Sequence, residues 1–187
     1  MYRIENIRIE PCEASAFVTV ERMHYTQGGV PKSWDIARVH DSVAVLLYHR
    51  DRDAFILVKQ FRPPVYLAND DGFTYELCAG IVDKSKPLEV IASEEILEEC
   101  GYEVAASRLE RVTSFYTAVG FAGARQTLYF AEVDDTMQRH EGGGIETEAI
   151  EVVYLPAEAA KAFIFDESRA KTPGIMFALT WFFEHRE

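Results

Sequence analysis

The segment that most constrains the fold is residues 87–100, which the sequence predicts to be a helix. Pro87 suits the first position of a helix, and Gly101 suits the position that follows its last turn. Because a helix turns by about 100° per residue, part of its apolar content falls on one face. That face carries Leu88, Ala92 and Ile96. We expect it to pack against the core of the protein.

Glutamates fall on the same face as these apolar residues. Glu95 and Glu99 lie one turn apart within it, and Glu98 lies at its edge. Two carboxylates buried together lose hydration and repel each other, and residues 87–100 contain no Lys or Arg to compensate them. A divalent cation would solve this problem, because clustered carboxylate oxygens suit Mg²⁺ or Mn²⁺. The alternative interpretation is an ordinary acidic face exposed to solvent.

Strand-like segments precede and follow this helix. Residues 43–49 form a continuous apolar run that is typical of a buried strand, and Gly28-Gly29 predicts a hairpin turn near the start of the chain. The Pro63-Pro64 pair is expected to end a strand. Further strands are predicted over 54–60, 73–82, 109–117, 126–133 and 151–155, and further helices over 156–165 and 172–186. This order indicates an α/β (α+β) domain over residues 41–187, preceded by a β-rich segment over residues 1–40.

Composition excludes several classes of protein. With 187 residues and 48% hydrophobic content, the chain can form one ordinary domain. Its formal charge of −12 would repel a phosphate backbone, so no nucleic-acid partner is expected. Three cysteines, an odd number without C-x-x-C spacing, favour a reducing compartment. Because no apolar run suits a signal peptide or a membrane span, we expect a cytoplasmic protein with no membrane partner.

The predicted helix lies within a longer pattern of fixed spacing. This pattern is Gly80-x5-Lys86-x7-Glu94-Glu95-Ile96-Leu97-Glu98-Glu99-Cys100-Gly101-Tyr102. It resembles the Nudix box, G-x5-E-x7-R-E-U-x-E-E-x-G-U, in which U is a bulky apolar residue. Two positions depart from the box, since Lys86 replaces a glutamate and Glu94 replaces an arginine. Both departures reverse the charge, so a supporting ion pair can survive with its signs exchanged.

The resemblance extends over most of the chain. It is carried by the box and by segments at residues 32–35, 40–43, 58–63, 75–80, 124–127 and 150–153. Together they resemble the uridine diphosphate glucose pyrophosphatase branch of the Nudix hydrolases, which is close to the ADP-ribose pyrophosphatases. The resemblance implies an α/β/α sandwich with a mixed sheet. It also implies Mg²⁺-dependent hydrolysis (Mn²⁺ is an alternative) of UDP-glucose to UMP and glucose 1-phosphate.

Two alternatives remain open at this point. The first is hydrolysis of ADP-ribose to AMP and ribose 5-phosphate. The second is a catalytically silent module that binds a nucleotide sugar, an interpretation that rests on the altered Lys86 and Glu94. Relatives use the N-terminal segment to form a homodimer, so the resemblance also implies a homodimer.

The resemblance assigns roles to particular residues. The implied metal ligands are the carbonyl of Ala79 and the side chains of Glu95, Glu98, Glu99 and Glu148. Glu146 is expected to be the general base, with Glu98 as a second catalytic candidate. The alternative for Glu146 and Glu148 is that both are ordinary loop charges.

Four further residues are expected to bind substrate. Trp34 is expected to stack on the base, Arg62 to hold a phosphate, and Glu76 and Arg125 to contact the substrate. Three of them have a structural alternative: core packing for Trp34, a surface arginine for Arg62 and a charge on the face of a strand for Glu76.

Overall fold

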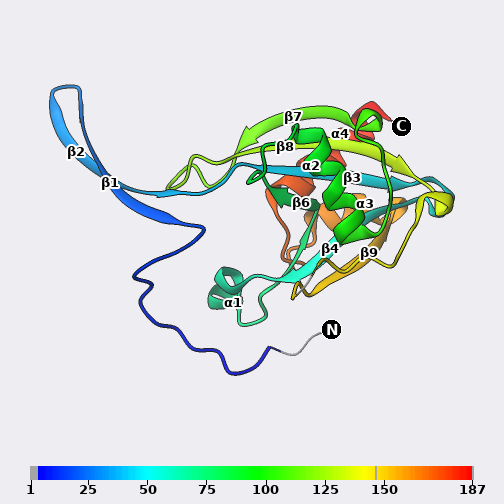
Figure 1. Cartoon of the computed structure of the whole chain (residues 1–187), viewed down its shortest axis with the longest axis horizontal. Coiled ribbons are helices and arrows are strands. Elements are labelled where there is room, and N and C mark those ends of the chain that lie inside the picture. Colours follow the sequence, from blue (N-terminus) through cyan, green and yellow to red (C-terminus); the bar gives the residue numbers. More distant parts are fainter. Residues whose placement is uncertain (1–3, 146, 187) are drawn as a thin grey trace.

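The computed structural model describes residues 4–145 and 147–186. A long antiparallel hairpin, β1 (Thr19–Gln27) and β2 (Val30–Arg38), extends away from the main body as an arm (Figure 1). Its turn is formed by Gly28 and Gly29, whose φ angles of 60° and 80° lie in the left-handed region that glycine tolerates. The hairpin predicted from this Gly-Gly pair is therefore confirmed.

The main body is built on a seven-stranded mixed sheet. Its strands are β3 (Ser42–His49), β4 (Ala54–Phe61), β5 (Phe73–Glu76), β6 (Cys78–Ile81), β7 (Glu110–Tyr116), β8 (Arg125–Val133) and β9 (Ile150–Pro156). The order is β5-β4-β3-β8-β7, with β6 also paired to β3 and β9 also paired to β4. β3 and β8 are parallel, whereas the other pairs are antiparallel. The predicted mixed sheet is thus confirmed.

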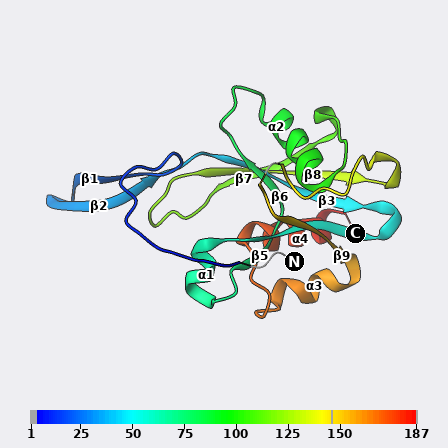
Figure 2. The same ribbon diagram turned by 60° about the horizontal axis from the view of Figure 1, so that its bottom comes forward.

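Helices cover both faces of this sheet (Figure 2). One face packs against α2 (Leu88–Glu95) and the π-helical turn that continues it, Ile96–Cys100. The other packs against α3 (Ala157–Phe165) and α4 (Pro173–His185). The central strand β3 supplies both layers, because its successive side chains point to opposite faces. Residues 43–47 of β3 are therefore all apolar and buried, as the sequence predicted.

Several boundaries differ from the predicted ones. After β4 ends, the proline pair begins a short helix, α1 (Pro63–Asn69), because proline fits the first positions of a helix. The strand predicted over 73–82 is two strands, which separate at Leu77. Pro87 lies one position before α2 instead of within it, and Gly101 ends the π turn with a φ of 80°. The predicted helix thus forms, but its second half is wider than an α-helix.

No helix in the described part of the chain is long and apolar enough to cross a membrane.

Candidate active site

Glu99 is the most deeply buried carboxylate of the box, with a side chain on the sheet side of the π turn. Its Oε2 atom accepts a hydrogen bond of 2.9 Å from the backbone amide of Ala79 in β6. Burial raises the pKa of Glu99 to about 8, and the negative charges of Glu95 and Glu148 add to this effect, while the Ala79 amide opposes it. Glu99 is therefore an inward-facing carboxylate, as the helical pattern predicted.

Glu95 lies against the backbone of β6. A Cβ atom at Gly80 would come within 2.1 Å of the Glu95 carboxylate, so only glycine leaves room for this contact. Glu95 is half-buried, and burial raises its pKa to about 7. The charge of Glu98 raises that pKa further, whereas the charge of Lys84 lowers it. The presence of glycine at the first position of the box thus has a direct steric explanation.

The backbone of Ala79 faces the same carboxylates. Its amide points away from β3, because it donates to Glu99. In a β-strand the N–H and C=O groups of one residue point to the same edge. The Ala79 carbonyl therefore lies on the edge that faces the box, and its role as a metal ligand stays a prediction.

A glycine loop packs on the end of the box helix. The amides of Gly143 and Gly144 donate to the carbonyls of Glu99 and Glu98, at 2.8 and 3.1 Å. These contacts satisfy carbonyls that the end of a helix leaves without a partner. A Cβ atom at Gly142 would come within 2.3 Å of the Glu99 carbonyl oxygen. The loop therefore depends on glycine for its close approach to two predicted metal ligands.

The same loop carries Glu148. The charge of Glu148 is among the causes that raise the pKa of Glu95 and of Glu99. Its Oε2 atom also accepts a 2.9 Å hydrogen bond from the amide of Ile145. Glu146, the predicted general base, lies outside the described residues.

Arg62 and Glu76 form a two-pronged ion pair beside this cluster. Two nitrogens of Arg62 donate to the two oxygens of Glu76, both at 2.7 Å. The buried hydroxyl of Thr74 donates to the same carboxylate at 2.5 Å. The hydrogen bond to Glu76 is the main reason why the pKa of Arg62 is raised, and the charges of Glu99 and Glu148 raise it further. The structure therefore joins Arg62 to Glu76 and adds Thr74 to the pair. The sequence analysis missed Thr74, although it lies on the same strand face two residues before Glu76.

The sequence predicted Trp34 and Arg125 as substrate-binding residues, and their contacts in the structure are with other parts of the chain than the carboxylates. Trp34 lies on the arm, where its indole N–H donates to the carbonyl of Gly120 at 2.8 Å. Arg125 is exposed at the start of β8, and its backbone amide donates to Asp41 at 2.8 Å. Within one chain, the described contacts do not join either residue to the carboxylates. Their predicted substrate contacts stay predictions.

The two altered box positions form the ion pair that exchanged charges allow. Lys86 Nζ lies 2.5 Å from Glu94 Oε1, and this contact is the main reason why the pKa of Glu94 is lowered. The link between the start and the middle of the box is therefore kept with opposite signs.

The donor set suits a hard divalent cation, because it consists of carboxylate and carbonyl oxygens collected around Gly80. Among the residues that the structure describes, no group of three or more His, Cys, Asp or Glu side chains is arranged closely enough to hold a metal ion. The carboxylates are thus near one another without forming a complete ligand cage.

Comparison with known proteins gives the family. No family model matches the chain. The chain is 41% identical to the uridine diphosphate glucose pyrophosphatase NUDT14 of Bos taurus, and 37% to that of Mus musculus, each over 98% of this chain and 96% of the relative. It is also 40% identical to a GDP-mannose pyrophosphatase of Cronobacter sakazakii, over 64% of this chain and 62% of the relative.

The box carboxylates around Gly80, in a chain that aligns almost end to end with such relatives, define a Nudix hydrolase. Within that class, the chain belongs to the uridine diphosphate glucose pyrophosphatase family. The resemblance stated from the sequence is therefore confirmed.

The glycine loop generates a first prediction. Gly142→Ala should lower activity at least about tenfold, because the added methyl group must push the loop away from Glu99 and so displace Glu148. Steady-state kinetics and the melting temperature would be measured. Gly28→Ala is the matched control for stability, since Gly28 has the same left-handed backbone but nothing within 4 Å of an added Cβ. A Gly142→Ala enzyme of normal activity would show that the loop contact is dispensable.

The raised pKa values generate a second prediction. Because Glu95 and Glu99 bind protons more tightly in the folded chain than in the unfolded chain, stability without metal should fall as pH rises from about 4.5 towards 8. Glu99→Gln should flatten this fall and abolish activity. Urea unfolding at pH 5 and pH 8 in the presence of a chelator would measure it. Equal slopes for both proteins would contradict the burial of an ionisable Glu99.

Proposed function

We propose that this protein is a divalent-metal-dependent pyrophosphatase that hydrolyses UDP-glucose to UMP and glucose 1-phosphate. The observation that carries the proposal is the packing of Glu95 and Glu99 against the backbone of Gly80 and Ala79. The glycine loop, which binds the carbonyls of Glu98 and Glu99, also holds Glu148. UDP-glucose is favoured over ADP-ribose because the relatives that align over almost the whole chain are named for it. In the reaction, water attacks one phosphorus and the bridging oxygen leaves with the other phosphate.

In this proposal the α/β/α Nudix arrangement supplies two kinds of group. Mg²⁺, or Mn²⁺ in its place, would be held by the Ala79 carbonyl and by Glu95, Glu98, Glu99 and Glu148. When bound, the metal neutralises charge on the pyrophosphate. Glu146 would take the proton from the attacking water, with Glu98 as the second candidate.

Arg62 would hold a phosphate oxygen. Its guanidinium has five N–H donors, of which two bind Glu76 and so fix the direction of the others. Glu76 would orient Arg62 and contact the substrate. Trp34 would stack on the base and Arg125 would contact the substrate. A cavity of about 310 Å³, with Glu76, Ala79 and Gln126 in its wall, adjoins β6 and offers space for part of the substrate.

The preserved Lys86–Glu94 pair favours an enzyme over a silent binding module. The silent module was considered because these two box positions depart from the pattern. Since their side chains still form an ion pair, the departure leaves the support of the box helix in place. We also propose a cytoplasmic location, which is supported by three cysteines that are all free thiols.

A product assay tests the function. Purified protein is incubated with UDP-glucose, UDP-galactose, GDP-mannose or ADP-ribose, with Mg²⁺ or with a chelator. We expect the Mg²⁺-dependent release of UMP from UDP-glucose to be the fastest of these reactions. Because Glu146 is the proposed base, Glu146→Gln should slow this reaction at least about a hundredfold. Faster release of AMP from ADP-ribose would keep the chemistry and change the substrate. Binding without any product would favour the silent module.

We further propose a homodimer built on the N-terminal arm. Val20, Met23 and Val30 have relative exposures of 75%, 50% and 57%, and an arm with so many exposed apolar side chains is unusual for a monomer.

Light scattering would test the dimer. The mass should be twice the 21.2 kDa of one chain. Val20→Asp should lower the mass to that of one chain. A second subunit that covered position 20 would bury the new charge, whereas a monomer leaves it exposed to water. A monomeric wild-type protein would contradict the dimer.

A further inference from the structure

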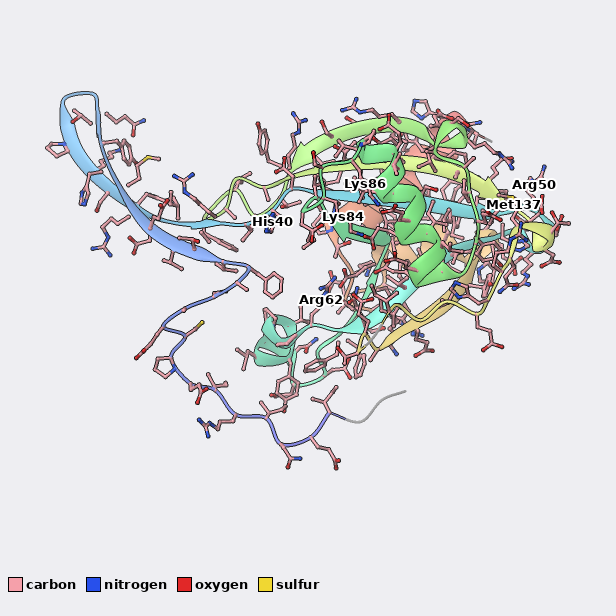
Figure 3. The ribbon with its side chains drawn as sticks, viewed as in Figure 1. His40, Arg50, Arg62, Lys84, Lys86 and Met137 are labelled. Carbon is pink, nitrogen blue, oxygen red and sulfur yellow. The ribbon has the colours of Figure 1, made fainter. Side chains whose placement is uncertain are left out.

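The cavity of about 310 Å³ next to β6 is joined to the candidate active site by two residues of its wall. Ala79 lines the cavity, and the backbone amide of the same residue binds Glu99 of the box. Glu76 also lines it, and the carboxylate of Glu76 holds Arg62, which Figure 3 shows and which lies between the end of β4 and the start of α1. A group bound in this cavity therefore lies beside the residues proposed to hold metal and phosphate.

Gln126 brings an amide group to the wall of the same cavity. Its Nε2 atom donates a hydrogen bond of 3.1 Å to the hydroxyl of Ser42, which is its partner in the parallel pair of β3 and β8. This bond uses one of the two N–H groups of the amide. Among the described residues, none binds the second N–H group or the Oε1 atom. The sheet thus orients the amide and leaves it one donor and one acceptor for a ligand.

The carboxylate of Glu76 also keeps a free acceptor position. A carboxylate has about four lone-pair positions. Oε1 of Glu76 accepts hydrogen bonds from Arg62 and Thr74, whereas Oε2 accepts one from Arg62 alone. A hydroxyl group of a ligand suits the remaining position, because it can turn its proton towards the charge. Uracil suits it less well, because its one N–H group lies between two carbonyl oxygens that the carboxylate would repel.

Gly174, in the first turn of α4, leaves space in the cavity. A Cβ atom at this position would lie 3.0 Å from Oε1 of Gln126 and 3.6 Å from Cζ of Phe115. The φ angle of Gly174 is not positive, so its backbone does not need glycine. What the missing side chain provides is room between an amide and an aromatic ring. A few fixed polar groups on an apolar wall are typical of a small-molecule site.

The hexose is the part of a nucleoside diphosphate sugar that these features fit. Its ring is bonded to a phosphate through a single oxygen, so it lies directly beside the pyrophosphate, whereas the ribose separates the base from it. Its hydroxyl groups both donate and accept, as Gln126 and Glu76 require, and its C–H groups can face Phe115. Trp34, the predicted stacking partner of the base, is on the arm and does not line this cavity.

We propose that this cavity binds the hexose of the substrate, and that Gln126 and Gly174 determine specificity for it. Gln126 forms hydrogen bonds with hydroxyl groups of the hexose, and Gly174 leaves the room that the ring occupies. This inference rests on the proposed function, because it takes the ligand to be a nucleoside diphosphate sugar. It extends the site from the box to the start of β8 and the start of α4.

The test shortens both the substrate and the wall of the cavity. The shortened substrate is the methyl ester of UDP, which has a methyl group in place of glucose and keeps the pyrophosphate, the ribose and the base. Gln126→Ala and Gly174→Ala are compared with the wild type by steady-state kinetics at saturating Mg²⁺. For each variant we expect kcat/KM to fall about tenfold with UDP-glucose and with ADP-glucose, because contacts with the hexose are lost. With the methyl ester it should stay within about twofold.

Gly123→Ala is the matched control, because Gly123 also lacks a positive φ and has nothing within 4 Å of an added Cβ. It should leave kcat/KM unchanged for all three compounds. The melting temperature of Gly174→Ala should not fall, because alanine favours a helix more than glycine does. An unchanged kcat/KM with UDP-glucose in Gln126→Ala and Gly174→Ala would overturn the proposal. So would an equal loss with the methyl ester, which places the cavity at the nucleotide, or a loss confined to UDP-glucose, which places it at the base.

A wild type that releases no UMP would contradict the proposed function, and binding then decides the role of the cavity. The Mn²⁺-loaded protein is titrated with UDP-glucose and with the methyl ester of UDP in a calorimeter. Tighter binding of UDP-glucose, reduced by Gln126→Ala and by Gly174→Ala, supports a hexose site. Equal binding of the two compounds, or no binding of UDP-glucose, overturns it.

Discussion

The contact between the box carboxylates and the backbone of β6 is the constraint on which the site depends. Glu99 accepts a hydrogen bond from the Ala79 amide, and Glu95 occupies the space that a side chain at position 80 would fill. Both contacts require α2 and its π turn to lie close to β6. The apolar face of that helix secures this distance, since Ile91, Ala92 and Ile96 are completely buried against the sheet. Hydrophobic packing therefore holds in place carboxylates that would repel each other in isolation.

A second set of contacts fixes what surrounds the carboxylates. The glycine loop donates hydrogen bonds to the carbonyls of Glu98 and Glu99, so the backbone of these predicted ligands is joined to the loop that carries Glu148. Arg62 is held by Glu76, and Glu76 is held by Thr74. Arg62, a candidate substrate-binding residue, is thus positioned by a carboxylate that has a second partner of its own. Such support is what a phosphoryl-transfer site needs, because its chemistry relies on placement and electrostatics.

Local patterns predicted much of this structure, and long-range contacts account for most of what they missed. The burial of Glu95 and Glu99 followed from helical spacing, and the hairpin followed from Gly28-Gly29. Helix α1 was missed because a proline pair can end a strand or begin a helix, and only the tertiary context decides. The docking of Gly142 on Glu99 joins residues far apart in sequence, so no local pattern contains it. For the same reason the sequence suggested Arg62 and Glu76 separately, and only the fold shows that they bind each other.

The charge of this site links the binding of metal and substrate. The chain has a formal charge of −12, and its candidate site gathers several carboxylates, whereas a nucleoside diphosphate sugar is itself an anion. Arg62 is already paired with Glu76, so its charge is partly compensated before any ligand arrives. A cation that neutralised the carboxylates would therefore strengthen the attraction of the site for a pyrophosphate. Each ligand must then raise the affinity for the other by the same factor, because coupling between two binding equilibria is reciprocal.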